Sequence, residues 1–132
     1  MASFEVKGFE ELLTQLDKLG RFDEVAPKMM KAGMEILQEE VVAEASKHKD
    51  TGAMAASIKP TGLMAGYGGG YYMCTRPTGR DKKGVRNMEK MVYLEFGVKG
   101  RPATPVITSA VIRADPRVLQ AMQEVFNREV MQ

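Results

Sequence analysis

The sequence predicts a single α+β domain, in which an N-terminal helix and one long helix pack on a small antiparallel sheet and a C-terminal helix completes the core. Three observations support this fold class. The chain has 132 residues and a mass of 14.6 kDa, which fits one domain with one core. Apolar residues recur at helical spacing in three segments, and residues typical of strands lie between the second and the third. No internal repeat or linker divides the chain, so residues 1–132 form one predicted domain.

The N-terminal region predicts a short strand followed by a helix. Residues 3–7 (SFEVK) alternate apolar and polar side chains, as a strand does. The following FEELLTQLDKLG places its phenylalanine and leucines at helical spacing, with acids in the first turn. Gly20 can close this helix.

A long helix is predicted from Asp23, as its N-cap, to about Lys47, with Pro27 in its early turns where a missing amide proton does least harm. One face of this helix is apolar except for Glu40. That face is formed by Val25, Met29, Ala32, Gly33, Ile36, Leu37, Glu40 and Val41. The helix is therefore expected to be the spine against which a sheet packs.

The middle of the chain predicts the sheet. Residues 51–60 (TGAMAASIKP) form a short helical or extended piece that Pro60 stops. Strand material at 58–73 is broken by a turn at GYGGG, and residues 88–98 (MEKMVYLEFGV) have the β-branched and aromatic content of a strand. Between the strands, the loop at 76–88 is expected to be basic, mobile and solvated.

The C-terminal region predicts an irregular segment and then a helix. Residues 99–105 (KGRPATP) cannot be helical because two prolines remove amide donors and restrict their neighbours. Apolar residues at helical spacing begin near Thr108, but Pro116 is expected to break or kink the helix, leaving residues 116–130 as its regular part.

Composition excludes several classes of protein. The net charge of +2 is too small by itself to indicate wrapping of nucleic acid or coating of a membrane. The apolar runs are far shorter than the ~20 residues that cross a bilayer, and the first residues carry acids where a signal peptide needs an apolar stretch. A single cysteine, Cys74, permits no intrachain disulfide and suits a reducing cytoplasm.

Candidate chemical groups are few. His48 lies in a charged run without a triad pattern, and Cys74 lies in a predicted strand as a buried or half-buried structural thiol. The GYGGG segment lacks the Gly-Lys-Ser/Thr ending of a phosphate loop. The paired acids at 10–11 and 39–40 diverge on helix surfaces and are expected to be solvated. We therefore expect no enzyme activity, cofactor, metal or small-molecule substrate.

The loop at 76–86 has the strongest implication for a partner. It carries five cations against one acid, and a basic loop can contact phosphates without reading sequence. An ordinary solvated loop can have the same composition. The cations are Arg76, Arg80, Lys82, Lys83 and Arg86. A small nucleic-acid-binding module that uses this loop is the alternative function.

Three segments in the correct order resemble the small neck or tail-component proteins of long-tailed phages of the Hong Kong lambdoid group. The opening VKGFEELLTQLDKLG is similar to the family's short strand, glycine and leucine-rich helix. Residues 51–58 (TGAMAASI) resemble its Thr-Gly and Ser-Ile signature. Residues 92–111 resemble its Tyr-x-Glu-Phe-Gly strand with the proline-containing segment and terminal helix that follow. At 106–107 the chain departs from the family, which more often has an aromatic residue there.

The resemblance implies a structural virion protein, made in the host bacterial cytoplasm and located at the head-tail junction. It implies a homo-oligomeric ring of six-fold or twelve-fold symmetry around the DNA channel, in contact with neighbouring connector and tail proteins and without a membrane. The expected subunit interface is Tyr93, Glu95, Phe96, Gly97, Arg101, Pro102 and Pro105. The basic loop then either lines the channel, with non-specific DNA contact, or meets an acidic neighbouring protein.

Overall fold

The computed structural model of the protein describes residues 9–18, 20–48, 52–66 and 70–130. The chain forms a mixed α+β fold, as expected. The helices are α1 (Phe9–Lys18), α2 (Phe22–Ala45), the short 3₁₀ helix η1 (Ser46–His48), α3 (Ala53–Ala56), α4 (Asn87–Phe96) and α5 (Ile107–Val130). The strands are β1 (Ile58–Pro60), β2 (Met64–Ala65), β3 (Tyr71–Tyr72) and β4 (Thr75–Pro77). The strand expected at residues 3–7 lies outside the described residues.

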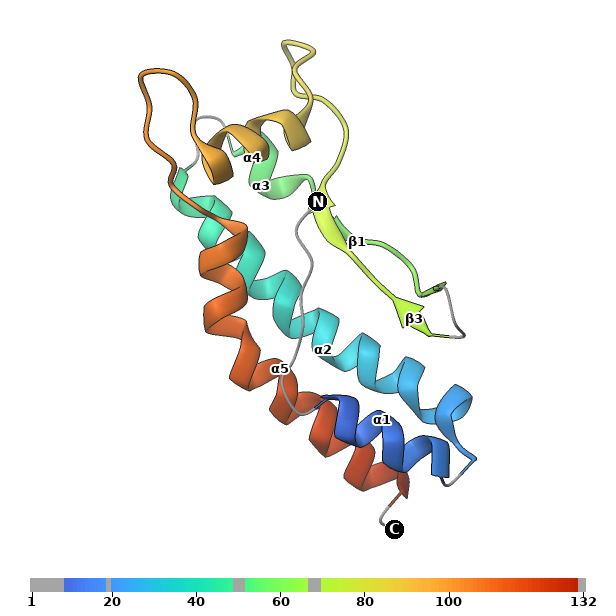
Figure 1. The fold of residues 1–132 in the computed structure, drawn as a ribbon. Coiled ribbons are helices and arrows are strands. Elements are labelled where there is room, and N and C mark those ends of the chain that lie inside the picture. The colour runs from blue at the N-terminus through green and yellow to red at the C-terminus, as the bar shows by residue number, and fades with distance from the viewer. Residues whose placement is uncertain (1–8, 19, 49–51, 67–69, 131–132) are drawn as a thin grey trace.

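The two long helices, α2 and α5, form the main body of the fold and run alongside one another (Figure 1). On α5 the buried residues recur every three or four positions, which is the spacing of one helix face. They are Ala110, Ala114, Val118, Met122, Val125 and Phe126. On α2, Gly33 lies at the closest approach, because a Cβ atom there would be 2.7 Å from Met122 Cε and 3.0 Å from Val118 Cγ1. The predicted apolar stripe of α2 therefore contacts α5.

Glu40, the one charge in that stripe, has partners on α5. Its carboxylate is 2.5 Å from Arg117 Nη1 and 3.8 Å from Arg113 Nε. Arg113 also pairs with the buried Glu44, and Lys47 lies 3.0 Å from the same Glu44 carboxylate. These charges run along the edge of the helix pair, where exposed ion pairs contribute little free energy, so the apolar stripe in the interior supplies most of the packing of α2 on α5.

The strands pack on α2 on the side away from α5, so that α2 lies between α5 and an antiparallel β-hairpin, residues 58–66 and 70–77 (Figure 1). Gln38 donates to the carbonyl oxygen of Ile58 at 2.8 Å and accepts a hydrogen bond from the Thr75 hydroxyl. At the start of α2, Phe22 stacks on Tyr71 with ring centroids 5.7 Å apart. These contacts attach both ends of the hairpin to one helix.

The hairpin has two paired sections with a change of register between them. β1 pairs with β4 so that Ile58 is opposite Pro77, and β2 pairs with β3 so that Met64 is opposite Tyr72. Three residues separate β1 from β2, whereas two separate β3 from β4. The extra residue acts as a β-bulge, a feature that locally bends and twists a ladder. The glycine-rich turn predicted between β2 and β3 includes residues 67–69, which lie outside the described residues.

The predicted strand at residues 88–98 is wrong, because this segment is the helix α4. Its buried residues, Asn87, Met91 and Glu95, are four positions apart, which is helical spacing. The β-forming side chains that suggested a strand are Val92, Tyr93 and Phe96, and all three are exposed. Methionine, glutamate, lysine and leucine supply most other positions and favour a helix.

Of the break or kink predicted at Pro116, the break is wrong, because α5 is one helix from Ile107 to Val130, and the kink stays a prediction. Pro116 is exposed, and the residue whose carbonyl loses its amide partner, Ile112, is 69% exposed. Water can therefore satisfy that carbonyl oxygen. Burial of the α5 stripe on α2 on both sides of the proline then outweighs the lost hydrogen bond.

The first two helices lie where the periodicity predicts them. α1 ends at Lys18, and Gly20 follows with φ of 68°, a conformation that favours glycine. α2 begins at Phe22, one residue before the predicted cap, with Arg21 preceding it. Of the segment at 51–60, the described residues 52–60 contain a short helix, α3, followed by a strand, β1, so the helical and the extended prediction are each partly right.

Candidate functional site

The corner where α4 leads into α5 is built around a buried carboxylate. Glu95, near the end of α4, accepts hydrogen bonds from the backbone amides of Ile107 and Thr108 at 3.0 and 2.9 Å. The Thr108 hydroxyl donates to the same carboxylate at 2.9 Å. The first amides of a helix have no partner inside that helix, and the helix dipole favours a negative charge there. Glu95, which belongs to α4, therefore caps the N-terminus of α5.

Between the two helices, residues 97–106 form an arm whose start requires glycine. Gly97 has φ of 78° and ψ of 170°, a region that only glycine occupies readily. A Cβ atom there would lie 2.9 Å from the backbone nitrogen of Ala103 and 3.0 Å from the carbonyl oxygen of Arg101. The arm folds back on itself, since Val98 and Arg101 pair as a bridge and the Thr104 amide donates to the carbonyl oxygen of Leu94 at 2.8 Å. As expected, it is not helical.

The structure divides the expected interface residues into two groups. Glu95 is buried and Gly97 is half-buried, and both shape the corner. The other five are exposed: Tyr93, Phe96, Arg101, Pro102 and Pro105. Phe96 is 77% exposed, and sequence reasoning missed two apolar neighbours, Val92 and Val98. The helical period of α4 is the signal that would have found Val92, because it is four residues from Phe96.

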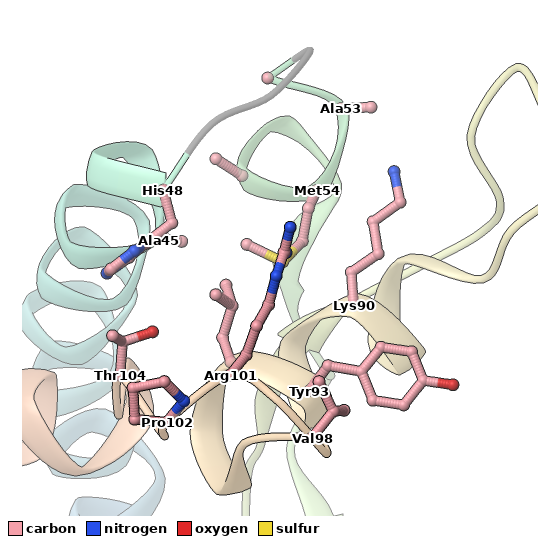
Figure 2. A pocket seen from close by; sticks show the side chains of 13 residues that line it. Ala45, His48, Ala53, Met54, Lys90, Tyr93, Val98, Arg101, Pro102 and Thr104 are labelled. Carbon is pink, nitrogen blue, oxygen red and sulfur yellow. The ribbon is translucent and has the colours of Figure 1, made fainter.

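A cavity of about 480 Å³ lies at this end of the molecule, between the end of α2, α3, α4 and the arm (Figure 2). Apolar groups from Ala45, Met54 and Leu94 form part of its wall. In Figure 2, the Arg101 and Lys90 side chains rise from the arm and from α4, and the Tyr93 hydroxyl points away from the cavity. That hydroxyl donates to Glu89, and this hydrogen bond raises the pKa of Tyr93.

The cations of the predicted basic loop are all exposed, and the hairpin adds one that sequence reasoning missed. Lys59 on β1 lies directly opposite Arg76 on β4, and both side chains face solvent. Arg80 is likewise opposite Arg86 in an antiparallel bridge. We call the whole set the basic strip: Lys59, Arg76, Arg80, Lys82, Lys83 and Arg86. Like charges directly opposite one another destabilise a ladder, by roughly 0.2–1 kcal/mol per pair.

Asp81, the one acid in the loop, organises it from inside. Its Oδ1 accepts the amides of Lys83 and Val85, each at 2.9 Å, and its Oδ2 lies 2.6 Å from Lys90 Nζ on α4. The hydrogen bond from Lys90, followed by the amide of Val85, holds the pKa of Asp81 below its ordinary value. The negative charge is therefore directed at α4 and the loop backbone, and it does not neutralise the basic strip. The predicted mobility of the loop remains a prediction.

The lowered pKa of Asp81 gives a testable pH dependence of the loop. Because the pKa of Asp81 in the folded protein lies below the ordinary 3.8, the ionised carboxylate stabilises the folded loop fully above pH 3.8. This stabilisation is lost as the pH falls through the folded-state pKa. We expect the amide resonances of Lys83 and Val85 to move together, with a midpoint below 3.8, in an NMR pH titration. The Asp81→Asn variant should lack this transition. A midpoint at or above 3.8 would contradict the proposed contacts.

The remaining candidate groups are dispersed. His48 lies on η1 at the cavity, and Cys74 is half-buried in the hairpin, as expected for a structural thiol. Among the described residues, no cluster of three or more histidine, cysteine, aspartate or glutamate side chains could hold a metal ion. None of the helices within the described ranges is long and apolar enough to cross a membrane.

Exposed apolar groups on α4 and exposed cations on the hairpin and the loop that follows it are features of a protein that acts through contacts with other macromolecules. Sequence comparison identifies its family. Residues 10–97 match the family described as "Bacteriophage HK97-gp10, putative tail-component". The chain belongs to this family of phage tail components, so its role is structural and it is a component of the phage particle. Comparisons with curated proteins and with solved structures gave no match.

Proposed function

We propose that the protein is a neck or tail-completion subunit that forms a ring with its own copies at the head-tail junction, around the channel through which DNA passes. Family membership supports the assembly role, and the exposed face of α4 is the observation that carries the self-association. The proposal places the ring, of six-fold or twelve-fold symmetry, in contact with connector and tail proteins after synthesis in the host cytoplasm.

The exposed face of α4 has the composition of a protein contact. Phe96 is 77% exposed, Tyr93 48% and Val92 39%, and Val98 at the start of the arm is 41% exposed. Large apolar side chains that gather on one face of a small protein mark interaction sites more often than single exposed ones do. Aromatic anchors of this kind supply much of the free energy of protein interfaces.

Each subunit of a ring needs two different contact faces, and one candidate face lies on each side of α4. Its cavity side carries Lys90, Tyr93 and Leu94, and Val98 of the arm follows on that side, whereas Val92 and Phe96 lie outside the cavity lining. We propose that the Phe96 side of one subunit contacts the cavity side of the next. Repetition of such a head-to-tail contact closes a ring when the rotation between subunits permits it. The exposed prolines of the arm, Pro102 and Pro105, limit the conformational entropy lost on contact.

Localisation in the particle tests the proposed function. We expect antibody labelling or cryo-electron microscopy of virions to place this protein at the head-tail junction, and virions assembled without it to have unjoined heads and tails. A virion that lacks the protein altogether, or that carries it only at the distal end of the tail, would overturn the proposal.

Replacing Phe96 with serine tests the assembly surface. Because Phe96 is exposed, the Phe96→Ser variant should unfold at the same temperature as the parent protein. Its self-association should weaken about 30-fold, the change that follows from a loss of about 2 kcal/mol at an interface anchor. Sedimentation velocity over a range of concentrations, or incorporation into virions where the parent is a monomer in solution, measures this.

Ile112→Ser is the matched control, because Ile112 is 69% exposed but lies on α5. This variant should associate like the parent protein. An equal loss of association in the two variants would show that exposed apolar area in general, and not the face of α4, drives assembly.

A further inference from the structure

The hairpin region concentrates positive charge in an otherwise slightly acidic protein. Residues 52–88 contain six of the nineteen basic residues but only one of the seventeen acidic residues, Asp81. Asp81 is bound to Lys90, which lies outside this segment. The region therefore carries six basic residues against one acidic residue, and that acid is already engaged by Lys90.

Ion pairing distinguishes these cations from those on the helices. On the helices, most basic side chains have an acidic partner within 4 Å; these are Lys28, Lys47, Lys90, Arg113, Arg117 and Arg128. In the part of the chain that the structure describes, no member of the basic strip forms an ion pair. All six are exposed, so their charges face solvent.

The backbone holds two pairs of these cations against one another. Lys59 is opposite Arg76 in the β1–β4 ladder, and Arg80 is opposite Arg86 in the bridge that follows. The inward positions of the same ladder, Ile58 and Pro77, are buried, so the alternation of the strand directs Lys59 and Arg76 outward together. Two repelling pairs in succession are unfavourable in the isolated subunit. A polyanion that bridges each pair would remove the repulsion.

From this arrangement we infer that the basic strip binds the phosphate backbone of duplex DNA without reading its sequence. The loop at 76–86 contains no aromatic residue, whereas the cores of protein interfaces are enriched in aromatic anchors and depleted of lysine. DNA therefore fits this surface better than an acidic protein does. The inference goes beyond the assembly role and does not require a ring.

A salt titration of DNA binding tests the inference. We expect the full-length protein to bind a short fluorescein-labelled duplex in an anisotropy assay, with an affinity that falls steeply between roughly 50 and 200 mM salt. In the Lys59→Gln/Arg76→Gln variant, the affinity at the lower salt should fall about 100-fold, and the slope of log affinity against log salt should decrease by about two. The melting temperature of this variant should not fall, because the change removes a repulsion.

The matched control removes two exposed cations elsewhere, in the Lys31→Gln/Lys99→Gln variant. Neither residue forms an ion pair with a described residue, and the net charge changes equally. This control should bind DNA within about threefold of the parent protein, with an unchanged salt slope.

Several outcomes would overturn the inference. DNA binding that is undetectable at the lower salt, an equal loss of binding in both variants, or a salt slope that Lys59→Gln/Arg76→Gln leaves unchanged would each do so. Competition by polyglutamate at the same charge concentration as effectively as by unlabelled DNA would instead identify an acidic protein as the partner. Virion localisation does not enter this assay, so a subunit found at the head-tail junction that fails to bind DNA would contradict this inference alone.

Discussion

Replacing Glu95 with alanine is expected to lower the free energy of unfolding by about 3 kcal/mol. The carboxylate accepts the amides of Ile107 and Thr108 and the Thr108 hydroxyl, and its removal leaves three donors at the start of α5 without that partner. A lost helix cap costs about 0.5–2 kcal/mol, and a hydrogen bond to a charged group contributes about 1.5–3 kcal/mol. For a domain of this size, the melting temperature should fall by about 10 °C.

Glu95→Gln separates the loss of charge from the loss of the acceptor. The glutamine side chain keeps one acceptor oxygen for the first turn of α5 and loses the negative charge that the helix N-terminus favours. We expect this variant to lie about midway between alanine and the parent protein in urea-induced unfolding. A Glu95→Ala variant as stable as the parent would show that the carboxylate does not hold the corner.

Replacing Gly97 with alanine is expected to destabilise the fold by at least about 3 kcal/mol. The backbone conformation at φ 78° and ψ 170° costs a residue with a side chain roughly 1–3 kcal/mol. The added Cβ atom would also lie 2.9 Å from the backbone nitrogen of Ala103, an atom that cannot move without moving the arm. The Thr104 amide should then lose its hydrogen bond to Leu94, which hydrogen exchange monitored by NMR would detect as faster exchange.

Gly62→Ala is the control for this prediction. Nothing lies within 4 Å of a Cβ atom at Gly62, so alanine should be neutral or slightly stabilising there. Equal destabilisation by the two substitutions would show that the conformation of Gly97 is not special. Because Gly97 also positions the arm, Gly97→Ala should in addition reduce self-association by more than its loss of stability explains.

The candidate site was predictable where its residues are contiguous. The basic loop is visible in the sequence as five cations within eleven residues, and the segment from Tyr93 to Pro105 is marked by its glycine and prolines. The role of each residue was not predictable. The sequence shows Glu95 and Phe96 as neighbours, but a helix directs one inward to α5 and the other outward to solvent. In the strand expected here, Glu95 and Phe96 would also have pointed to opposite faces, but each would have shared its face with other residues than in the helix.

The sequence by itself determined α1, α2 and the part of the α5 stripe formed by Val118, Met122, Val125 and Phe126, because local periodicity specifies which face of a long helix is buried. It also determined that the strands are antiparallel and lie between the long helices along the chain. Only the tertiary structure decided that residues 87–96 form a helix and not a strand. Their intrinsic propensities are mixed, and the burial of Met91 and Glu95 on one helix face decides between the two. The register of the hairpin placed Lys59 directly opposite Arg76. Strand pairing brings together residues that are distant in the sequence, so local sequence patterns could not predict this pair.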